Sequence, residues 1–580
     1  MITKLTLHNF KSVSKQVYDF TQFDLLVGRN NSGKSTVLQA LAIWQFCVDE
    51  FHRSKRTGSK GIQVVLPNFT ALPVPEFNLL WKDRTDRAYP VSNGTKKQEF
   101  ILIEILVEWR RCDGNSAEFG VELRYHSPQT IYAIPTAGWA KFRACEEEGD
   151  LPKIAYVPPF SGLEPTERSL DIAPIHQQVG KGQPGSVLRN LLLRVCPSPT
   201  RGIDGRIAKG YEPPADWSEL ALIVKRWFSV DIQTPIYDPA KDVYITVDYR
   251  EKGKDYDIIS GGSGFHQTLT LLAFFYGYHP TTILLDEPDA HLHVNLQREI
   301  LDYFIRKSIE RNTQFLIATH AEEFARGVGA SQIVSLLRQV PTRIQSTPDV
   351  LRAMAEVSNE EITRLIESPC ILYVEGESDE RILRAWAGQC NAQDAMDKFC
   401  FKSMTGGSKE DKKNKADMHF AALKQIIPEV SRLMLFDYDD DNTAFHPEPD
   451  NVALAEWKRK NIENYLLVPD AWKRAALKQM NCGAEGDLFS QPVLRAIDEF
   501  FAGQNLTLPP GKTWRNLTAN VFEVVDGKRI LFENDKSLFH LLRNGSPSLQ
   551  LIREEVAKYM VADEIHQDVH DFFGKLVALA

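Results

Sequence analysis

The segment that most constrains this chain is a phosphate-binding loop close to its N-terminus. Residues 23–27 are apolar and predict a short buried strand, and residues 28–35 follow with the spacing Gly-x-x-x-x-Gly-Lys-Ser. An amphipathic helix is expected directly after the loop. A P-loop nucleotide site requires this order, because the glycines let backbone N–H groups turn toward phosphates at the positive end of the helix. The sequence therefore predicts an α/β domain that binds ATP.

The loop residues have separate expected tasks. Lys34 can reach the β- and γ-phosphates, and the Ser35 hydroxyl can ligate Mg²⁺. The alternative is a chance glycine turn before a helix, which the later motifs disfavour. The residues of this segment predicted to contact ATP are Gly28, Asn30, Asn31, Ser32, Gly33, Lys34, Ser35 and Thr36.

Two later apolar strands end in side chains suited to ATP hydrolysis. Residues 281–285 lead into Asp286 and Glu287, and residues 314–319 lead into His320. Asp286 is expected to hold Mg²⁺, while Glu287 orients and deprotonates the attacking water. His320 can touch the γ-phosphate from the carboxyl edge of the sheet, where ligands of open α/β sheets bind. A plain strand-end histidine is the alternative, and its position after the Asp-Glu strand favours the catalytic role.

A glycine-rich segment stands between these motifs. Residues 259–264 read Ile-Ser-Gly-Gly-Ser-Gly and precede an apolar helix. With the P-loop and the Asp-Glu strand, this resembles the ABC ATPase superfamily, whose signature reads Leu-Ser-Gly-Gly-Gln; here isoleucine replaces the leucine, and serine and glycine stand where the superfamily has glutamine. The resemblance implies that Ser260, Gly261 and Gly262 contact ATP held by a second subunit, and hence a homodimer or higher oligomer formed through the ATPase domains. A flexible Gly-Ser linker is the alternative.

The long segment between P-loop and signature shows no sustained heptads. Its strand-like runs, 100–109 and 121–125, predict a compact insertion and disfavour a coiled-coil arm. The glutamine of the superfamily's Q-loop has no clear counterpart, and residues 154–160 are its expected neighbourhood.

Acidic residues follow two strands in the second half of the chain. Glu375 ends the strand 370–374, and Asp379 lies in the first turn of the next helix. Asp437 and Asp439 end the strand 433–436, and side chains two apart on a strand share a face. Such strand ends converge in a parallel sheet, and clustered carboxylates suit Mg²⁺ or Mn²⁺. The alternatives are a solvated acidic turn and an EF-hand calcium loop, which lacks the expected glycine at Asn442.

The pattern of these acidic residues resembles that of the Toprim fold, which occurs in topoisomerases, primases and the OLD-family (overcoming lysogenization defect) nucleases. The match consists of Glu-Gly at 375–376 and Asp-x-Asp at 437–439, with Asp379 fitting the OLD pattern. The segment 458–466 resembles the family's later motif, which implies that Glu463 is a metal ligand. It also makes Lys458, Arg459 and Lys460 candidates for phosphate contact.

The motifs of both halves, together with the two resemblances, predict two sets of site residues. The catalytic set is Glu287, His320, Glu375, Asp379, Asp437, Asp439 and Glu463. The metal-binding set is Ser35, Asp286, Glu375, Asp379, Asp437, Asp439 and Glu463.

Composition limits compartment and partners. The 580 residues carry a net charge of −9, so attraction to nucleic acid requires local basic patches. The lysines flanking 405–408 are one candidate, and the alternative for such a run is a solvated loop. The eight cysteines are scattered singly, which disfavours a disulfide framework and a zinc site. No apolar run of about 18 residues predicts a transmembrane helix. We expect a cytoplasmic protein without membrane association.

An ABC-type ATPase fused to a Toprim domain is the OLD-family architecture, found in Gabija-type and related bacterial anti-phage defence ATPase-nucleases. The expected fold is α/β: a P-loop ATPase domain, a Rossmann-like Toprim domain, and a mostly helical C-terminal extension with one strand pair near 521–532. The expected boundaries are 1–342 for the ATPase domain, 343–368 for a helical connector, 369–475 for the Toprim domain and 476–580 for the extension.

The function implied is a nuclease, dependent on Mg²⁺ or Mn²⁺, that cleaves DNA under control of the ATP state. A second defence-system protein is a candidate partner. Two alternatives remain open: an ATP-dependent sensor or scaffold that controls a separate effector, and a nuclease that cleaves RNA, for example transfer RNA. A role in DNA repair also remains open.

Overall fold

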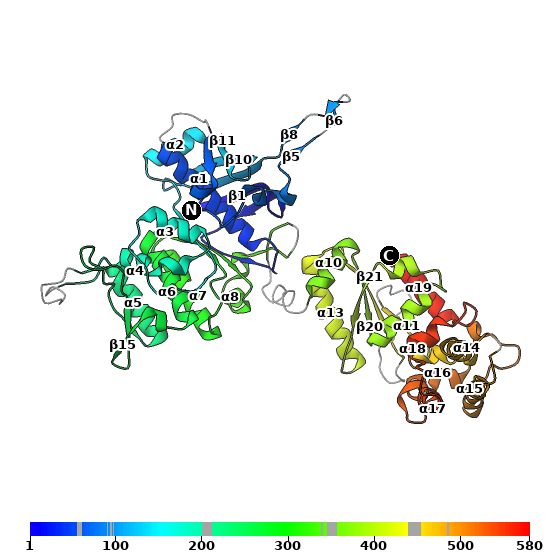
Figure 1. The fold of residues 1–580 in the computed structure, drawn as a ribbon. Coiled ribbons are helices and arrows are strands. Elements are labelled where there is room, and N and C mark those ends of the chain that lie inside the picture. The colour runs from blue at the N-terminus through cyan, green and yellow to red at the C-terminus, as the bar shows by residue number, and fades with distance from the viewer. Residues whose placement is uncertain are drawn as a thin grey trace. The chain divides into compact units, whose positions relative to one another are not determined.

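The structure is a computed structural model that divides the chain into two compact units, Met1–Leu351 and Arg352–Ala580 (Figure 1). None of the described helices combines the length and apolarity needed to cross a membrane. The structure describes residues 1–28, 30–54, 61–89, 91–92, 95–96, 98–199, 211–337, 340–344, 357–438, 454–483 and 486–580.

The first unit contains an antiparallel sheet. Its strand β9 alternates buried and partly buried residues, so one face packs on a core. A thin two-stranded ribbon, β5 (Arg87–Ala88) with β8 (Glu99–Phe100), extends from it (Figure 1). The order of the sheet is β2 (Val13–Asp19), β1 (Ile2–Phe10), β9 (Ile103–Arg110), β10 (Ser116–Ser127), β11 (Thr130–Ala137) and β4 (Ile62–Val65).

A second sheet carries the nucleotide motifs. Its central strands are parallel and buried along their whole length, which explains their continuous apolar sequences. In register, Val27 pairs with Thr319 and Asp286 with Ala318, so the P-loop, the Asp-Glu pair and His320 lie at one edge. The order is β12 (Ile154–Val157), β16 (Thr282–Asp286), β17 (Gln314–Thr319), β3 (Phe23–Val27), β18 (Ile333–Ser335) and the antiparallel β19 (Thr342–Arg343).

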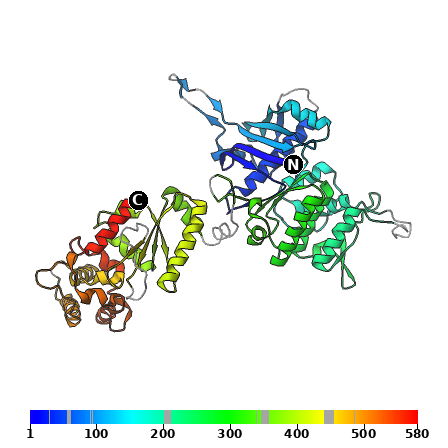
Figure 2. The ribbon, with the colours of Figure 1, turned by 180° about the vertical axis from the view of Figure 1, so that it is seen from behind.

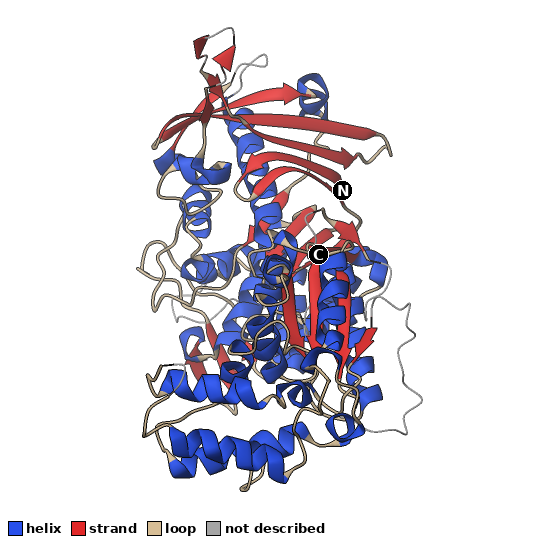
Figure 3. Ribbon diagram, turned by 90° about the vertical axis from the view of Figure 1, so that its right-hand side faces the viewer, coloured by secondary structure: helices blue, strands red, loops and turns tan. Residues whose placement is uncertain are grey.

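Helix α1 (Lys34–Ser54) contacts strands of both sheets. Figure 3 shows the long strands of the antiparallel sheet with helices against it. Helix α1 is buried on almost all sides, and Trp44 Nε1 donates to Phe119 O at 2.9 Å. Strands β9 to β11 form a compact insertion. After α1, the longest described helix before the signature has 14 residues, so the described part contains no coiled-coil arm. The remaining helices of the unit are α2 (Trp139–Glu147), α3 (Ile172–Gly180), α4 (Leu188–Val195), α5 (Ala215–Phe228), α6 (Ser263–Tyr278), α7 (Val294–Glu310) and α8 (Glu322–Arg326).

The second unit is built on a four-stranded parallel sheet, with helices on both faces. Helices α10 (Asn359–Glu367) and α13 (Lys409–Ile426) lie on one side, and α11 (Glu377–Ala387) lies on the other with the C-terminal helices (Figures 1 and 2). The strand order is β21 (Phe399–Ser403), β20 (Cys370–Val374), β22 (Ser431–Phe436) and β23 (Leu454–Glu456).

The C-terminal segment is helical and shares one hydrophobic core with this sheet. Leu372 and Trp386 belong to the same buried cluster as Trp472 and Phe572, so no separate core begins at residue 476. Its helices are α14 (Pro469–Gln479), α15 (Gln491–Gly503), α16 (Asn520–Val524), η9 (Arg529–Glu533), α17 (Leu538–Gly545), α18 (Arg553–Lys558) and α19 (Gln567–Leu579).

Two local predictions are wrong. The expected strand pair near 521–532 is α16 followed by η9, because Phe522, Leu531 and Phe532 are buried from short helical turns. The lysines after residue 408 lie on α13, not in a loop. The second half of the expected connector is α10, whereas residues 345–356 lie outside the described part.

Candidate functional site

The P-loop is folded around the Lys34 side chain. Gly33 has φ +92° and Asn31 has φ +65°, and a Cβ on Gly28 would lie 2.4 Å from Ser32 Oγ. Lys34 is buried and its Nζ donates to Gly28 O at 2.8 Å; burial lowers the pKa of Lys34. Ser32 Oγ is buried and has no hydrogen-bond partner among the described residues. An orphaned hydroxyl beside a buried ammonium fits a phosphate-binding loop.

The two predicted magnesium ligands of this unit, Ser35 and Asp286, are hydrogen-bonded to each other. Ser35 Oγ donates to Asp286 Oδ1 at 2.9 Å, although 251 positions separate the residues. Tyr156 Oη donates to Asp286 Oδ2 at 3.0 Å. Burial raises the pKa of Asp286. Tyr156 lies in the segment where a Q-loop glutamine was expected, and sequence reasoning missed it because a tyrosine on a strand reads as core.

Glu287 and His320 also come together. His320 Nδ1 lies 3.4 Å from Glu287 Oε1, and both side chains are partly exposed. Glu287 has φ +52°, and its N–H donates to Ala318 O at 2.9 Å. A non-glycine residue in this region is strained, and such strain clusters at functional sites.

Two polar residues near Glu287 and His320, Gln267 and Asp289, belong to no motif recognised in the sequence. Gln267 Nε2, from α6, donates to Glu287 O at 3.2 Å and to Pro288 O at 2.9 Å. Thr319 Oγ1 donates to the buried Asp289 at 2.6 Å, and burial raises the pKa of Asp289. The signature helix is thus tied to the backbone of the predicted catalytic base.

The signature residues begin α6. Ile258–Ser260 form the short helix η5, and Gly262 is the N-cap of α6. Ser260 and Gly262 are exposed. A Cβ on Gly261 would lie 2.4 Å from the Phe265 ring, so a larger residue there would displace that ring. The signature therefore offers an exposed helix start, as an anion-binding segment requires.

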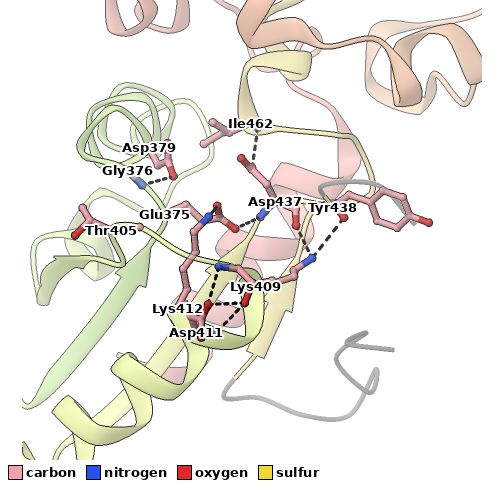
Figure 4. Close-up of polar contacts among 12 residues, drawn as sticks. Glu375, Gly376, Asp379, Thr405, Lys409, Asp411, Lys412, Asp437, Tyr438 and Ile462 are labelled. Atoms are coloured by element: carbon pink, nitrogen blue, oxygen red, sulfur yellow. Dashed lines mark hydrogen bonds and ion pairs between the residues drawn. The ribbon is translucent and has the colours of Figure 1, made fainter. Parts of the chain in front are cut away.

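The carboxylates of the second unit lie at the carboxyl ends of adjacent parallel strands. Figure 4 shows Glu375, after β20, beside Asp437, after β22. The Asp437 N–H donates to Glu375 Oε1 at 3.0 Å, and Lys412 forms an ion pair with Glu375 Oε2. Asp437 Oδ1 accepts a hydrogen bond from Ile462 N at 3.1 Å. The structure brings these two predicted ligands together, while Asp439 lies outside the described residues.

Asp379 and Glu463 are buried near this pair. Asp379 Oδ2 accepts from Gly376 N at 3.0 Å, which closes the first turn of α11 (Figure 4). Burial, followed by the negative charges of Glu463 and Glu375, raises the pKa of Asp379 to about 6. Glu463 Oε1 lies 2.6 Å from Arg553 Nε, on α18. Within the described ranges, no three acidic, His or Cys side chains form a ready-made metal site.

The basic residues of this unit divide into internal and peripheral groups. Lys409 is buried, pairs with Glu456 and donates to Asp437 O at 2.6 Å. Arg459 is buried too: it donates to Asn464 O at 2.9 Å and packs on the Tyr465 ring. The predicted phosphate contact by Arg459 is therefore wrong, because its guanidinium is used inside the protein.

Lys458 and Lys460 line a cavity of about 410 Å³ together with Tyr438, directly after Asp437. Lys458 is 70% exposed, and Lys460 lies 3.7 Å from Asp526. Glu523 lines the same cavity, and Lys458 Nζ lies 3.5 Å from Asp568 Oδ1, so both lysines have acidic neighbours. The exposed ammonium of Lys458 suits contact with a phosphodiester backbone.

Two protein-family models match the chain. Residues 1–87 match an "AAA ATPase domain", and residues 206–324 match an "AAA domain, putative AbiEii toxin, Type IV TA system". The two ranges contain the P-loop, the signature, the Asp-Glu strand and His320. The chain therefore contains an AAA-type ATPase domain, and such domains bind nucleotide, typically with Mg²⁺. No curated protein matches the chain.

Solved structures similar to the chain include three SMC heads. An SMC head bound to the C-winged helix domain of ScpA is 17% identical, with 58% of this chain and 93% of that chain covered and a TM-score of 0.33. An SMC head domain from Thermotoga maritima is 14% identical, with 60% of this chain and 99% of that chain covered and a TM-score of 0.31. The third is an Smc head domain with an extended coiled coil, bound to the C-terminal domain of ScpA and derived from Pyrococcus furiosus. It is 13% identical, with 63% of this chain and 98% of that chain covered and a TM-score of 0.33.

Proposed function

We propose that this protein is an ATPase whose nucleotide state controls a metal-dependent nuclease acting on DNA, in bacterial anti-phage defence of the OLD type. The observation that carries the nuclease is the meeting of Glu375 and Asp437 at the ends of adjacent parallel strands, with Asp379 and Glu463 buried nearby. The charges of Glu463 and Glu375 add to burial in raising the pKa of Asp379, and a divalent cation relieves such repulsion.

In the first unit, the residues take the roles their contacts support. Lys34 would contact the β- and γ-phosphates, and Ser35 with Asp286 would hold Mg²⁺, which would supply charge compensation at the transferred phosphoryl group. Glu287 accepts a proton from the attacking water, and His320, 3.4 Å away, orients that carboxylate or contacts the γ-phosphate. Ser260, Gly261 and Gly262 of a second copy complete the site, so the active form is a homodimer or larger oligomer.

In the second unit, residues 369–475 form a Toprim-like nuclease domain that the helices of 476–580 complete. Glu375, Asp379, Asp437, Asp439 and Glu463 would hold Mg²⁺ or Mn²⁺, which when bound would supply activation of water and compensation of charge on the scissile phosphate. Lys412 leaves Glu375 when the cation binds and becomes available to the phosphate. Lys458 and Lys460 hold the nucleic-acid backbone.

The test is cleavage of supercoiled plasmid by the full chain with Mg²⁺ or Mn²⁺, in the presence of ATP, of ADP and of no nucleotide. We expect wild-type protein to nick the plasmid and Asp437→Ala to fail, while the exposed-carboxylate control Asp394→Ala nicks normally. Equal cleavage in all three nucleotide states would refute the control by ATP. Cleavage of labelled RNA but not DNA would establish the RNA nuclease instead.

One observation favours a second candidate, an ATP-dependent scaffold that controls a separate effector. Glu375 and Glu463 already pair with Lys412 and Arg553, so two of the carboxylates are neutralised without metal. A scaffold predicts no Mn²⁺ binding to the nucleotide-free chain and no cleavage of any nucleic acid. Nucleic-acid binding that is independent of metal would support it.

A further inference from the structure

A cavity of about 240 Å³ lies in the first unit beside the ATP site but contains no P-loop residue. It is a half-open pocket lined by the middle and end of α1, by β12, by α3 and by the end of α6. The side chains that decide its chemistry are Gln45, Asp49, Lys153, Tyr156, His176 and Tyr278. Ligand sites for drug-sized molecules are about 300–1,000 Å³. This cavity therefore suits one or two fused rings, and its open side leaves room for a substituent such as a sugar.

Two polar atoms in the cavity are placed for an external partner. Gln45 holds Asp49: its Nε2 donates to Asp49 Oδ1 at 2.8 Å, while its Oε1 accepts from Ile154 N at 3.0 Å. Tyr278 Oη is buried and has no hydrogen-bond partner within the described part of the chain. Burial raises the pKa of the Asp49 carboxyl and that of Tyr278, the latter to about 12. Buried polar groups in native proteins are generally hydrogen-bonded, so each exception calls for a partner.

The walls are flat and aromatic. The rings of His176 and Tyr278 stack with centroids 5.6 Å apart, and Phe46, Phe274 and Tyr156 complete the lining. Such walls bind a planar ring through its faces and edges. Burial lowers the pKa of His176, so its imidazole is a neutral wall rather than a cation.

The charges around the cavity exclude a simple cation as the ligand. Lys153 and Arg53 also line it, and the Arg194 guanidinium lies 5.4 Å from the Tyr278 ring centroid. Besides burial, the positive charges of Arg194 and Arg53 lower the pKa of His176, so the potential on that side of the cavity disfavours an amine. A neutral planar heterocycle with N–H donors satisfies the Asp49 carboxyl and the Tyr278 hydroxyl without adding positive charge.

We propose that this cavity binds a purine nucleoside, with the base between the aromatic walls and hydrogen-bonded to Asp49 and Tyr278. Tyr156 connects the site to ATP hydrolysis: its ring lines the cavity, and its hydroxyl donates to Asp286 Oδ2 at 3.0 Å. A bound purine fixes the Tyr156 ring and with it the magnesium-binding carboxylate, so the ATPase rate responds to the nucleoside.

The test is calorimetric titration of the full chain with adenosine, guanosine, cytidine and uridine, none of which carries a phosphate for the P-loop. We expect binding of a purine nucleoside that Asp49→Asn and Tyr278→Phe each weaken about threefold to tenfold, the value of one hydrogen bond. Tyr278→Phe removes a hydroxyl that has no partner in the described part, so its fold is preserved. Lys34→Ala and the exposed-residue control Tyr244→Phe leave the affinity unchanged.

Several outcomes would overturn the site. These are no binding of either purine, a preference for pyrimidines, loss of binding in Lys34→Ala, or affinity unaffected by both cavity variants. The connection to hydrolysis is measured separately, as phosphate release from ATP at saturating nucleoside. The connection is supported if the nucleoside changes the rate of phosphate release by the wild type but not by Tyr156→Phe. A wild-type rate that is the same with and without nucleoside would overturn it.

Discussion

The two acidic sites of this chain are built on the same principle but neutralised differently. Each lies at the carboxyl edge of parallel strands, where the register brings distant carboxylates together. In the first unit, Asp286 is held by two neutral hydroxyls, of Ser35 and Tyr156. In the second, Glu375 and Glu463 are held by the cations of Lys412 and Arg553. A metal can join the first site by adding to a hydroxyl ligand, whereas at the second it must first displace a cation.

In the first unit, metal binding and proton transfer are assigned to different residues, whereas in the second unit the same carboxylates are assigned both tasks. At the ATP site, the predicted magnesium ligands and the predicted base are different residues. At the second site, the same carboxylates would bind the metal and set the chemistry, so any change there affects both. The second site is also held by α18, a helix far along the sequence, whereas the ATP site rests on its own sheet and α1.

The largest effect is expected from Glu287→Gln. The amide preserves size and leaves Ser35 and Asp286 intact, but it cannot take a proton from water, so hydrolysis falls by about 10²- to 10⁴-fold. ATP affinity, measured by titration, changes less than about threefold. The exposed control Glu299→Gln hydrolyses ATP normally. Equal loss of binding and hydrolysis would contradict the separation of roles at this site.

The next effect in size concerns the buried pair of Arg553 and Glu463. Arg553→Gln leaves the buried carboxylate without its cation, and breaking a buried pair in this way costs about 3–5 kcal/mol. We expect a lower melting temperature for the second unit, which Mn²⁺ partly restores because it takes over the role of the cation.

Arg543→Gln, on the neighbouring α17, provides the control and should melt like wild type. Destabilisation that Mn²⁺ does not relieve would show that Glu463 is a structural residue rather than a ligand. That result would also weaken the contrast between the two sites.

Much of both sites could be predicted from the sequence, because motifs at strand ends gather wherever the strands are parallel. This is why Ser35 meets Asp286 and Glu375 meets Asp437 across long separations. What could not be predicted are contacts from residues outside any motif. Tyr156 reads as a core residue, and Arg553 lies 90 positions from the glutamate that it neutralises.

The lysine run after residue 408 illustrates a missed local signal. Its charges suggested a solvated loop, yet Ser408 and Asp411 form a capping box that starts α13. Ser-x-x-Asp was readable in the sequence, and it would have placed Lys409 and Lys412 on a helix. Which carboxylates these lysines meet depends on the packing of that helix against the sheet, which a single sequence does not specify.

The smallest effect tests whether a metal must displace Lys412 from Glu375. Lys412→Ala removes the cation that competes for Glu375, so nucleotide-free protein should bind Mn²⁺ about tenfold more tightly, equivalent to about 1.4 kcal/mol. Lys413→Ala is the matched control, because its side chain pairs with Asp417 on the same helix. Plasmid nicking should fall despite the tighter binding if Lys412 moves to the phosphate. Weaker Mn²⁺ binding would mean that the lysine orders the carboxylates for the metal, and unchanged binding would mean that the metal does not use Glu375. Either result would remove the proposed difference between a site open to metal and a site closed by its own cation.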